Sequence, residues 1–568
     1  MKKLNKYIKY AGIVCVMMSS FAFNSCSIDV DPQDRISESA VWSDPSTAEL
    51  YINGLYAEFK NFQFGMFPDL GYDNAMDALA DGMKFTSNTP GNGTVNILVS
   101  NANYFSPASV GLNYWSPGYV RIRRVNEAIY GLKNRSALSD IEKTKYEAEA
   151  RFIRAYTYFW LAKIHGSIII LDDLDQYTTK DHPRSSEEAV YDFMIQDLLF
   201  AAENLPKTHL AGRATSGAAY ALLSRVALFA GSIAKYDRNL YNNDALTGIN
   251  QNRANEYFTA AADAALKVIE LSNEGLYDLD NNFANIFQNK NTKEAIFRVD
   301  FVAPSITHQY DLGYAPPKDA LGNTLVYGVP TAELVDEFEM ADGSKFDWNN
   351  PDHRANPYSN REPRFYASIL YNGANWKGRT LNTTPEDVEE GFIQFGTLGD
   401  PKRTVTGYYA RKFLDPSNTS FVQNRSTQSW IELRYAEVLL NIAEAKAELN
   451  DFSSAATYLN TLRAARGLSG VSFSNNQQAM VAIEHERIVE LAFEGHRFWD
   501  LRRWRKAHIT LNDVKFTGHR ITPQGGGFSY EVVPADAVDR SFTGKLYYLP
   551  IPEGEIQRND ALTPIHGW

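Results

Sequence analysis

The chain has 568 residues, enough for a sizeable hydrophobic core, and its net charge of −12 argues against nucleic acid, whose phosphates an acidic surface repels. Its two cysteines lie within the first 26 residues, so the body after them has no disulfide, catalytic thiol or cysteine-based zinc site. Aromatic residues make up 13% of the chain, and their amphipathic rings suit a ligand-binding surface as well as a core.

The first segment is typical of a secretion signal. Residues 1–10 contain four lysines and no acid, and an apolar run and small residues follow before Cys26. This order predicts a signal peptide, residues 1–25, whose apolar run is too short to span a membrane. Residues 23–26 resemble the lipobox of bacterial lipoproteins, in which the cysteine becomes the lipidated N-terminus. The resemblance implies an acylated Cys26, and we expect a polar tether over residues 26–43.

The first helix is predicted at the start of the folded body. Asp44 stands as an N-cap before Pro45, and apolar residues recur at helical spacing up to Phe59. A stretch rich in glycine, asparagine and aromatic residues follows, at about 61–114, without a sustained period. Because loops of that length are uncommon in compact domains and often functional, we expect part of the ligand-binding surface there.

Helical segments then follow one another in pairs. Small and apolar residues recur at three- and four-residue spacing, as in Ala219, Leu223 and Val226, which predicts close antiparallel packing. The pairs resemble tetratricopeptide hairpins but do not repeat with the period of about 34 residues. We therefore predict a mostly α-helical fold, an irregular solenoid of such hairpins. The predicted helices cover residues 119–132, 141–166, 185–206, 215–231, 253–271, 431–450, 452–468 and 486–504.

The composition changes between the helical regions. Residues 273–428 are rich in glycine, proline, asparagine and aromatics, with short β-like runs at 294–302 and 365–373. We predict a loop-rich lobe there, projecting from a helical scaffold. No linker composition separates a second domain. The expected organisation is one domain, residues 44–568, with the scaffold at about 44–272 and 430–510 and a second loop-rich stretch at about 511–568.

Residues 486–504, ERIVELAFEGHRFWDLRRW, combine carboxylates, arginines and aromatics. Their apolar residues follow the spacing of a buried helical stripe, so we predict one continuous helix that stabilises the scaffold. Gly495 is expected at a close helix crossing. His496 has no partner at metal-ligand spacing, and a regular amphipathic helix gives no indication of catalysis. The ion pairs expected three residues apart are Arg487–Glu490, Glu494–Arg497, Arg497–Asp500 and Asp500–Arg503.

This stretch is similar to the ERxxELxFEGxRxxDLxRW signature of the SusD/RagB family of outer-membrane lipoproteins, and it matches every fixed position. Other segments agree with the resemblance along the whole mature chain. They are the lipobox, RVNEAIYGL, RFIRAYTYFWLAKIHG, ADGSKFD, REPRFYASILY and YYLPIPEGEIQRNDALTP.

The resemblance implies a fold of tetratricopeptide-like helix pairs that support a loop-rich ligand-binding face. It further implies a protein without enzymatic activity, anchored by lipid in the outer membrane and facing the cell exterior. Such a protein captures oligosaccharide and delivers it to a SusC-like TonB-dependent transporter. A peptide-capturing member of the same family is the nearest alternative, and an all-helical glycosidase is the more distant one.

Ligand residues are expected in the loops, because a sugar stacks its C–H face on an aromatic ring and its hydroxyls bond to polar side chains. The acidic run YDNAMDALADG could also bind calcium, although it lacks the spacing of an EF-hand loop, and no cofactor is predicted. The predicted ligand-binding residues are Asp73, Asn74, Asp77, Tyr104, Tyr114, Tyr314, Trp348 and Trp376, with Asp81, Asn103 and Tyr310 beside them.

Overall fold

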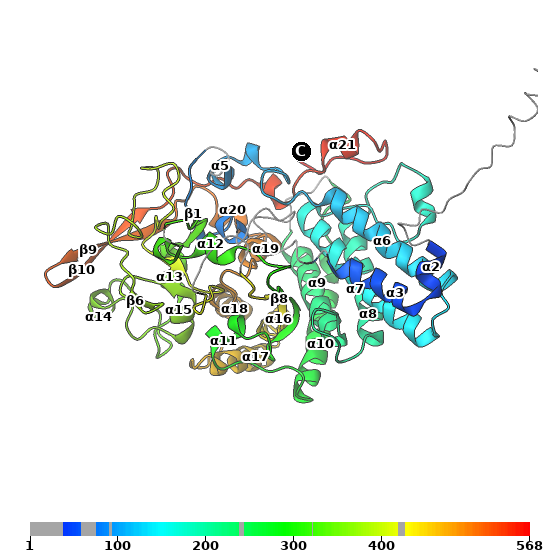
Figure 1. Cartoon of the computed structure of the whole chain (residues 1–568), viewed down its shortest axis with the longest axis horizontal. Helices are drawn as coiled ribbons and strands as arrows, with labels where there is room; N and C mark the ends of the chain where they lie inside the picture. The colour runs from blue at the N-terminus through cyan, green and yellow to red at the C-terminus, as the bar shows by residue number, and fades with distance from the viewer. Residues whose placement is uncertain are drawn as a thin grey trace, which may run out of the picture.

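A computed structural model describes residues 38–57, 59, 75–89, 94–237, 244–320, 322–418 and 426–568. The predicted signal peptide, Cys26 and the first part of the tether lie outside the described residues, as do Asp73 and Asn74. The long helices gather at one end of the molecule and the loop-rich lobe with its short strands at the other (Figure 1). The mostly α-helical prediction is therefore confirmed.

The long helices pack in chain order, as a solenoid does. Helix α7 lies between α6 and α8, helix α9 between α8 and α10, and α10 packs on α16. The contact between α10 and α16 joins the two parts of the scaffold across the loop-rich lobe. The scaffold helices are α2 (Glu38–Ser43), α3 (Pro45–Tyr56), α6 (Trp115–Asn134), α7 (Asp140–His165), α8 (Glu187–Asn204), α9 (Ser216–Tyr236), α10 (Ala254–Asn273), α16 (Tyr435–Glu448), α17 (Phe452–Ala465), α18 (Asn476–Glu490) and α19 (Arg497–Arg503).

Local signals explain where these helices begin. The Asp44 side chain accepts a hydrogen bond from the Ser46 N–H at 2.8 Å, so the predicted N-cap of α3 is confirmed. Helix α7 begins with a capping box, in which Ser139 and Glu142 satisfy each other's backbone N–H groups. Helix α16 begins later than the predicted residue 431, because the five residues before it form a strand instead.

Helix α2 lies within the segment that the sequence indicates as a tether. Its Trp42 is 1% exposed and packs against Gly131 of α6, where a Cβ atom would lie 2.2 Å from the indole. Only a glycine leaves room for this contact. The folded scaffold therefore begins before residue 44.

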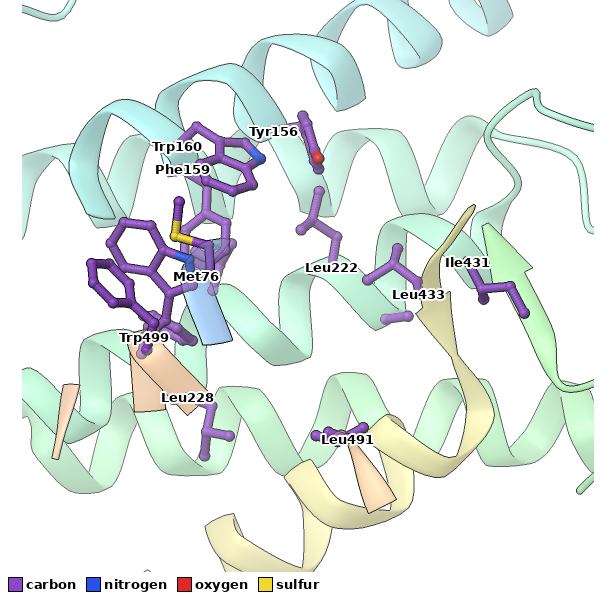
Figure 2. Packing of buried hydrophobic residues seen from close by; sticks show 14 of the residues in the cluster. Met76, Tyr156, Phe159, Trp160, Leu222, Leu228, Ile431, Leu433, Leu491 and Trp499 are labelled. Carbon is purple, nitrogen blue, oxygen red and sulfur yellow. The ribbon is translucent and has the colours of Figure 1, made fainter. Parts of the chain in front are cut away.

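Among the described helices, α9 alone is long and apolar enough to cross a membrane. In its most apolar window 94% of the residues are buried inside the fold, as in a core helix. Figure 2 shows Leu222 and Leu228 of α9 in one buried cluster with Trp160 of α7 and Trp499 of α19. The two indoles meet edge to face, with ring centroids 5.8 Å apart.

The lobe is built from short helices and narrow sheets. The described strands pair only as five two-stranded antiparallel sheets, and the β9–β10 hairpin projects from the lobe (Figure 1). The predicted run 294–302 contains β2, which pairs with β8. The run 365–373 begins in helix α15 and continues into the short strand β4, which pairs with β7. The short helices are α4 (Ala75–Ala78), α5 (Thr94–Ser100), α11 (Phe283–Gln288), α12 (Tyr310–Tyr314), α13 (Ala332–Glu337), α14 (Pro351–Ala355), α15 (Pro363–Ser368), α20 (Ala507–Thr510) and α21 (Glu553–Ile556). The strands are β1 (Met83–Phe85), β2 (Ala295–Val299), β3 (Gly328–Pro330), β4 (Ile369–Leu370), β5 (Asn375–Trp376), β6 (Arg379–Thr380), β7 (Tyr409–Ala410), β8 (Trp430–Arg434), β9 (Thr517–Gln524) and β10 (Gly527–Pro534).

The motif at 486–504 is not one helix, and that prediction was wrong. Helix α18 ends at Glu490 and α19 begins at Arg497, with a turn between them in which Phe493 and Gly495 have φ values of 64° and 74°. Gly495 therefore serves a left-handed backbone conformation and not a close helix crossing, since a Cβ there would meet nothing nearer than Met76 at 3.9 Å.

The turn also changes the ion pairs of the motif. Asp500–Arg503 is present at 2.8 Å, and the other three predicted pairs are absent from these described residues. Glu494 lies in the turn and shares no helix face with Arg497. The residues of the other two pairs do share a helix, but their charges pair with residues of other segments instead. The observed pairs are Arg487–Asp500 at 2.8 Å, Glu494–Arg434 at 2.7 Å, Arg497–Asp81 at 2.7 Å and Arg497–Glu484 at 2.9 Å.

Candidate functional site

Four half-buried aromatic side chains form a continuous row on the lobe, which we call the aromatic row: Trp348, Tyr530, Tyr358 and Tyr371. Ring centroids are 5.5 Å apart between Trp348 and Tyr530, 5.8 Å between Tyr530 and Tyr358, and 4.6 Å between Tyr358 and Tyr371. Each of the four side chains nevertheless remains partly exposed. The row therefore offers aromatic surface to a ligand as well as to the fold.

Trp348 is held in a defined orientation. Its indole N–H donates to Oδ2 of Asp336 at the end of α13, at 2.9 Å, and its ring packs on His519 of β9 with centroids 4.6 Å apart. Burial raises the pKa of Asp336 to about 7. The carboxyl is thus more easily protonated than an exposed aspartate, and it remains an acceptor for the indole in either state.

The other three rings come from different elements. Tyr530 lies on β10, opposite Ile521 of β9, while Tyr358 and Tyr371 flank helix α15. The tight Gln524–Gly527 connection folds the hairpin back and places Tyr530 between Trp348 and Tyr358.

An open groove of about 700 Å³ lies along the same segment as Trp348 and Tyr358. Backbone hydrogen bonds close this segment into a loop, as from Ala341 N–H to the Asn360 carbonyl at 2.7 Å. Hydrogen bonds from Ser344 hold the pKa of Asp342 below its usual range, so this carboxylate is an acceptor near neutral pH. The groove is lined by Met340, Ala341, Asp342, Asp352, His353, Asn356, Ser359 and Asn360.

Trp348 is the one predicted ligand residue that lies in the aromatic row. Tyr104 is 62% exposed, but on the short 3-10 helix Ala102–Tyr104 in a different part of the fold. Asp77 is buried beside the motif turn and accepts a hydrogen bond from the Gly495 N–H at 3.2 Å. The structure does not bring the predicted residues together, and their ligand contacts stay predictions.

Three predicted aromatics are engaged within the fold. Tyr114, Tyr314 and Trp376 are each at most 2% exposed, so they offer no open ring face in this structure. The Tyr114 hydroxyl accepts from Arg121 at 2.9 Å, Tyr314 stacks on Tyr310 with centroids 4.6 Å apart, and the Trp376 indole donates to Asp319 at 2.6 Å.

The sequence reasoning missed Tyr358, Tyr371 and Tyr530. The run GFSYEVV after a pair of glycines has the alternation of a hairpin strand and would have placed Tyr530 on one. Tyr358 and Tyr371 have no local pattern that distinguishes them from packing residues. Within the described parts of the chain, no group of three or more histidine, cysteine, aspartate or glutamate side chains is arranged to hold a metal ion.

Comparisons with known proteins agree along most of the chain. A model described as the SusD family matches residues 286–568, and one described as "Starch-binding associating with outer membrane" matches residues 57–228. SusD-like protein P2 of Formosa agariphila is 27% identical over 79% of each chain. A solved SusD-like protein from Bacteroides fragilis has a TM-score of 0.77 at 27% identity and covers 94% of this chain and 100% of its own. A solved SusD-like carbohydrate binding protein from the same species has a TM-score of 0.74 at 23% identity, covering 92% and 99%, and shows the shared fold.

Proposed function

The chain belongs to the SusD family, and from that membership we propose that it captures an oligosaccharide with the aromatic row and the groove beside it. The observation that carries the proposal is the row of Trp348, Tyr530, Tyr358 and Tyr371, two of whose rings come from the segment that also lines a polar groove. A solved protein of the same fold is described as carbohydrate binding.

The chemistry of the site suits a sugar. The C–H face of a pyranose is apolar and its rim is hydroxylated, so it needs a ring to stack on and nearby donors and acceptors. The row supplies the rings, and Asp342, Asn356 and Asn360 in the groove supply amide and carboxylate groups. Because Trp348 is held by Asp336 and His519, stacking on it costs little additional side-chain entropy.

The cellular role that we propose has three parts. The protein is anchored in the outer membrane through acyl chains on Cys26, it faces the cell exterior, and it passes its ligand to a SusC-like TonB-dependent transporter. The lipobox-like residues 23–26 and the outer-membrane association in the description of one matching family model support this role.

Binding without turnover is the expected behaviour. A glycosidase needs one carboxyl with a raised pKa next to the substrate and a second, ionised carboxylate opposite. Asp336 beside the row has a raised pKa, but it accepts the Trp348 indole N–H and so serves to hold that ring. In the groove, hydrogen bonds from Ser344 lower the pKa of Asp342, which suits an acceptor of sugar hydroxyls.

Isothermal titration of the purified mature chain against a panel of neutral oligosaccharides tests the proposal. We expect at least one glycan to bind without product formation, and Trp348→Ala to weaken it about tenfold through loss of the stacking ring. Tyr130→Ala is the matched control, since Tyr130 is 37% exposed on α6, away from the lobe. Equal losses in the two variants, or binding to peptides in place of glycans, would contradict the proposal.

A further inference from the structure

A second concave site lies beside the motif turn, outside the aromatic row. It is a cavity of about 70 Å³ between α4, α13 and the α18–α19 turn, which we call the acid-rimmed pocket. Its apolar lining includes Leu334, Ile488 and Leu491, and its carboxylates include Asp77, Glu333 and Glu337. The floor therefore suits an alkyl chain, whereas the rim suits a positive charge.

Asp77 gives the pocket its chemical character. Its side chain is 2% exposed, and only its Oδ2 is used within the fold, to accept the Gly495 N–H at 3.2 Å. Oδ1 faces Gly82 across the pocket, where a Cβ atom would lie 4.0 Å from it. Within the described residues no lysine or arginine nitrogen lies within 4.0 Å of this carboxylate. Burial accordingly raises the pKa of Asp77 to about 7, as expected for a buried acid without a paired cation.

The two arginines in the pocket wall do not neutralise this acid. Arg487 is committed to Asp500, at 2.8 and 3.1 Å. Arg497 is committed to Asp81 at 2.7 Å and to Glu484 at 2.9 Å. The pocket is left with an excess of negative charge.

Asp81 on the rim pairs with Arg497, whereas Glu333 and Glu337 have no arginine or lysine partner among the described residues. Glu333 accepts from the N–H and hydroxyl groups of Thr517, at 2.8 to 3.1 Å. The carboxylate of Glu337 lies 3.5 Å from His485 and is partly open to solvent. A cation that entered the pocket could therefore pair with Asp77, Glu333 or Glu337 without displacing an arginine or lysine.

The size and lining of the pocket indicate which class of ligand it can hold. One water needs about 10–15 Å³ by the same measure, so the cavity has room for a short alkyl chain with a charged head. A lysine or arginine side chain has this form, since its stem buries on apolar surface while its head seeks carboxylates. The lining contains no aromatic ring for a sugar, and among the described residues no acid cluster has metal-binding geometry.

We propose that the acid-rimmed pocket takes a lysine or arginine side chain of a partner polypeptide. Charge complementarity selects this occupant, because a buried carboxylate without a cation gains most from a desolvated ammonium or guanidinium group. The proposal does not depend on glycan capture, since the pocket and the aromatic row share no residue. A result that contradicts glycan capture therefore does not contradict binding of a cationic side chain in the pocket, and the reverse also holds.

A pair of short peptides tests this proposal on the purified mature chain. The probe is acetyl-Gly-Gly-Lys-Gly-Gly-amide, and the reference has norleucine in place of lysine, which keeps the alkyl stem and removes the charge. Titration calorimetry should show the lysine peptide binding about tenfold more tightly than the norleucine peptide. Equal affinities for the two would overturn the proposal.

Two variants remove the preference by different routes. Asp77→Asn removes the charge but keeps an oxygen that can accept the Gly495 N–H. Gly82→Ala keeps every charge and places a methyl group in the cavity, 3.7 Å from Leu334 and 4.0 Å from Asp77 Oδ1, which are ordinary contacts. Both variants should lose most of the preference for lysine, while Asp263→Asn, an exposed acid on α10, should keep it.

The possible results distinguish a lysine side chain of a polypeptide from a cationic sugar and from non-specific charge attraction. If Asp77→Asn does not fold, Gly82→Ala alone decides the result, because its lysine preference must fall. A glucosamine trimer that binds in an Asp77-dependent manner, while the lysine peptide does not, would overturn a polypeptide partner. Loss of the preference in all three variants, including Asp263→Asn, would show non-specific charge attraction and would likewise overturn the proposal.

Discussion

Glu490 is fully buried, yet it meets three guanidinium groups. Arg434 lies 2.7 Å from its carboxylate, Arg466 2.8 Å and Arg364 2.9 Å. Burial alone would raise the pKa of Glu490, but the charges of the three arginines outweigh burial and hold this pKa well below its usual range. The arginines come from three segments of the chain, so one side chain of α18 ties the lobe to the scaffold.

Replacing this carboxylate should be costly. Glu490→Gln leaves the buried arginines short of negative charge, so we expect the free energy of unfolding to fall by about 3–5 kcal/mol. Urea unfolding followed by circular dichroism measures the change. Glu270→Gln is the control, because Glu270 pairs with Lys267 on an exposed face of α10 and should contribute less than about 1 kcal/mol. Similar losses in both variants would contradict this account of the buried network.

Asp336 should make stability depend on pH. Its folded pKa of about 7 lies above the ordinary value of 3.8, so between these values the folded state binds more protons than the unfolded state. The contribution of Asp336 is therefore fully present below about pH 4 and is lost as the pH rises through 7. Its slope is at most about 1.4 kcal/mol per pH unit.

Asp336→Asn should remove this dependence. Relative to the wild type, the variant should gain stability as the pH rises from 4 to 8, as urea midpoints at several pH values would show. Asp263→Asn should run parallel to the wild type over the same range. A constant difference between Asp336→Asn and the wild type would mean that Asp336 does not retain its proton in the fold.

At the scale of elements, the turn between α18 and α19 is the feature that the periodicity of the sequence failed to predict. Lys412 donates to the carbonyls of Glu490 and Ala492, at 3.1 and 2.9 Å, and to the Glu494 carboxylate at 2.6 Å. A buried ammonium group thus satisfies carbonyls at the end of α18 that a continuing helix would otherwise bond. These hydrogen bonds stabilise the turn, which is therefore not a frayed helix end.

Gly495→Ala tests whether the backbone or the available space matters in this turn. We expect a loss of about 1–2 kcal/mol, because an L-residue is strained at a φ of 74° although the Cβ would meet no atom closer than 3.9 Å. Gly554→Ala in α21 is the matched control, since its Cβ would meet nothing within 4 Å and its φ is not positive. Thermal unfolding should show a lower midpoint for the first variant and no loss for the second. An unchanged midpoint for Gly495→Ala would contradict the strain.

Periodicity predicted helices such as α6 and α10 because each buries one repeating face, whereas α7 and α9 are buried almost all round. It could not predict the break after Glu490, since Leu491 and Ala492 are buried in a continuing helix and in the observed turn alike. The ion pairs could not be predicted from local spacing either, because the partners lie far apart in the chain. One of the two partners of Arg497 is Asp81, more than 400 residues away in the chain.

At the scale of the whole molecule, the same limit applies to the candidate site. Trp348 could be predicted because a tryptophan stands in a polar loop, whereas the row around it joins segments that are close only in the fold. Tyr114, Tyr314 and Trp376 stand in similar local sequence but are buried. Exposure of an aromatic residue depends on distant packing that a single sequence does not encode locally.

Helix α2 packs on the scaffold largely through Trp42, which covers Gly131, meets the Tyr51 ring with centroids 5.2 Å apart and accepts the Ala137 N–H at its carbonyl at 3.2 Å. Trp42→Ala should leave a cavity over Gly131, lower the free energy of unfolding by about 3–5 kcal/mol and free α2 for proteolysis. Limited proteolysis with mass spectrometry would locate the cleavage. Leu50→Ala is the control, because Leu50 on α3 is 63% exposed and its loss should change little. Protection of α2 in the Trp42 variant would show that other contacts hold it.

Strands β2 and β8 pair side by side, with Ala295 opposite Arg434 and Val299 opposite Trp430, although about 130 residues separate them. The chain therefore leaves and re-enters the helical scaffold at one stem, and α10 meets α16 directly behind it. Within the inserted lobe, Arg364 and Lys412 are fixed to the scaffold through Glu490 and the α18–α19 turn. The outer loops of the lobe, which make no such contact, can change in length or sequence without moving a scaffold helix, so that one framework can present many different recognition surfaces.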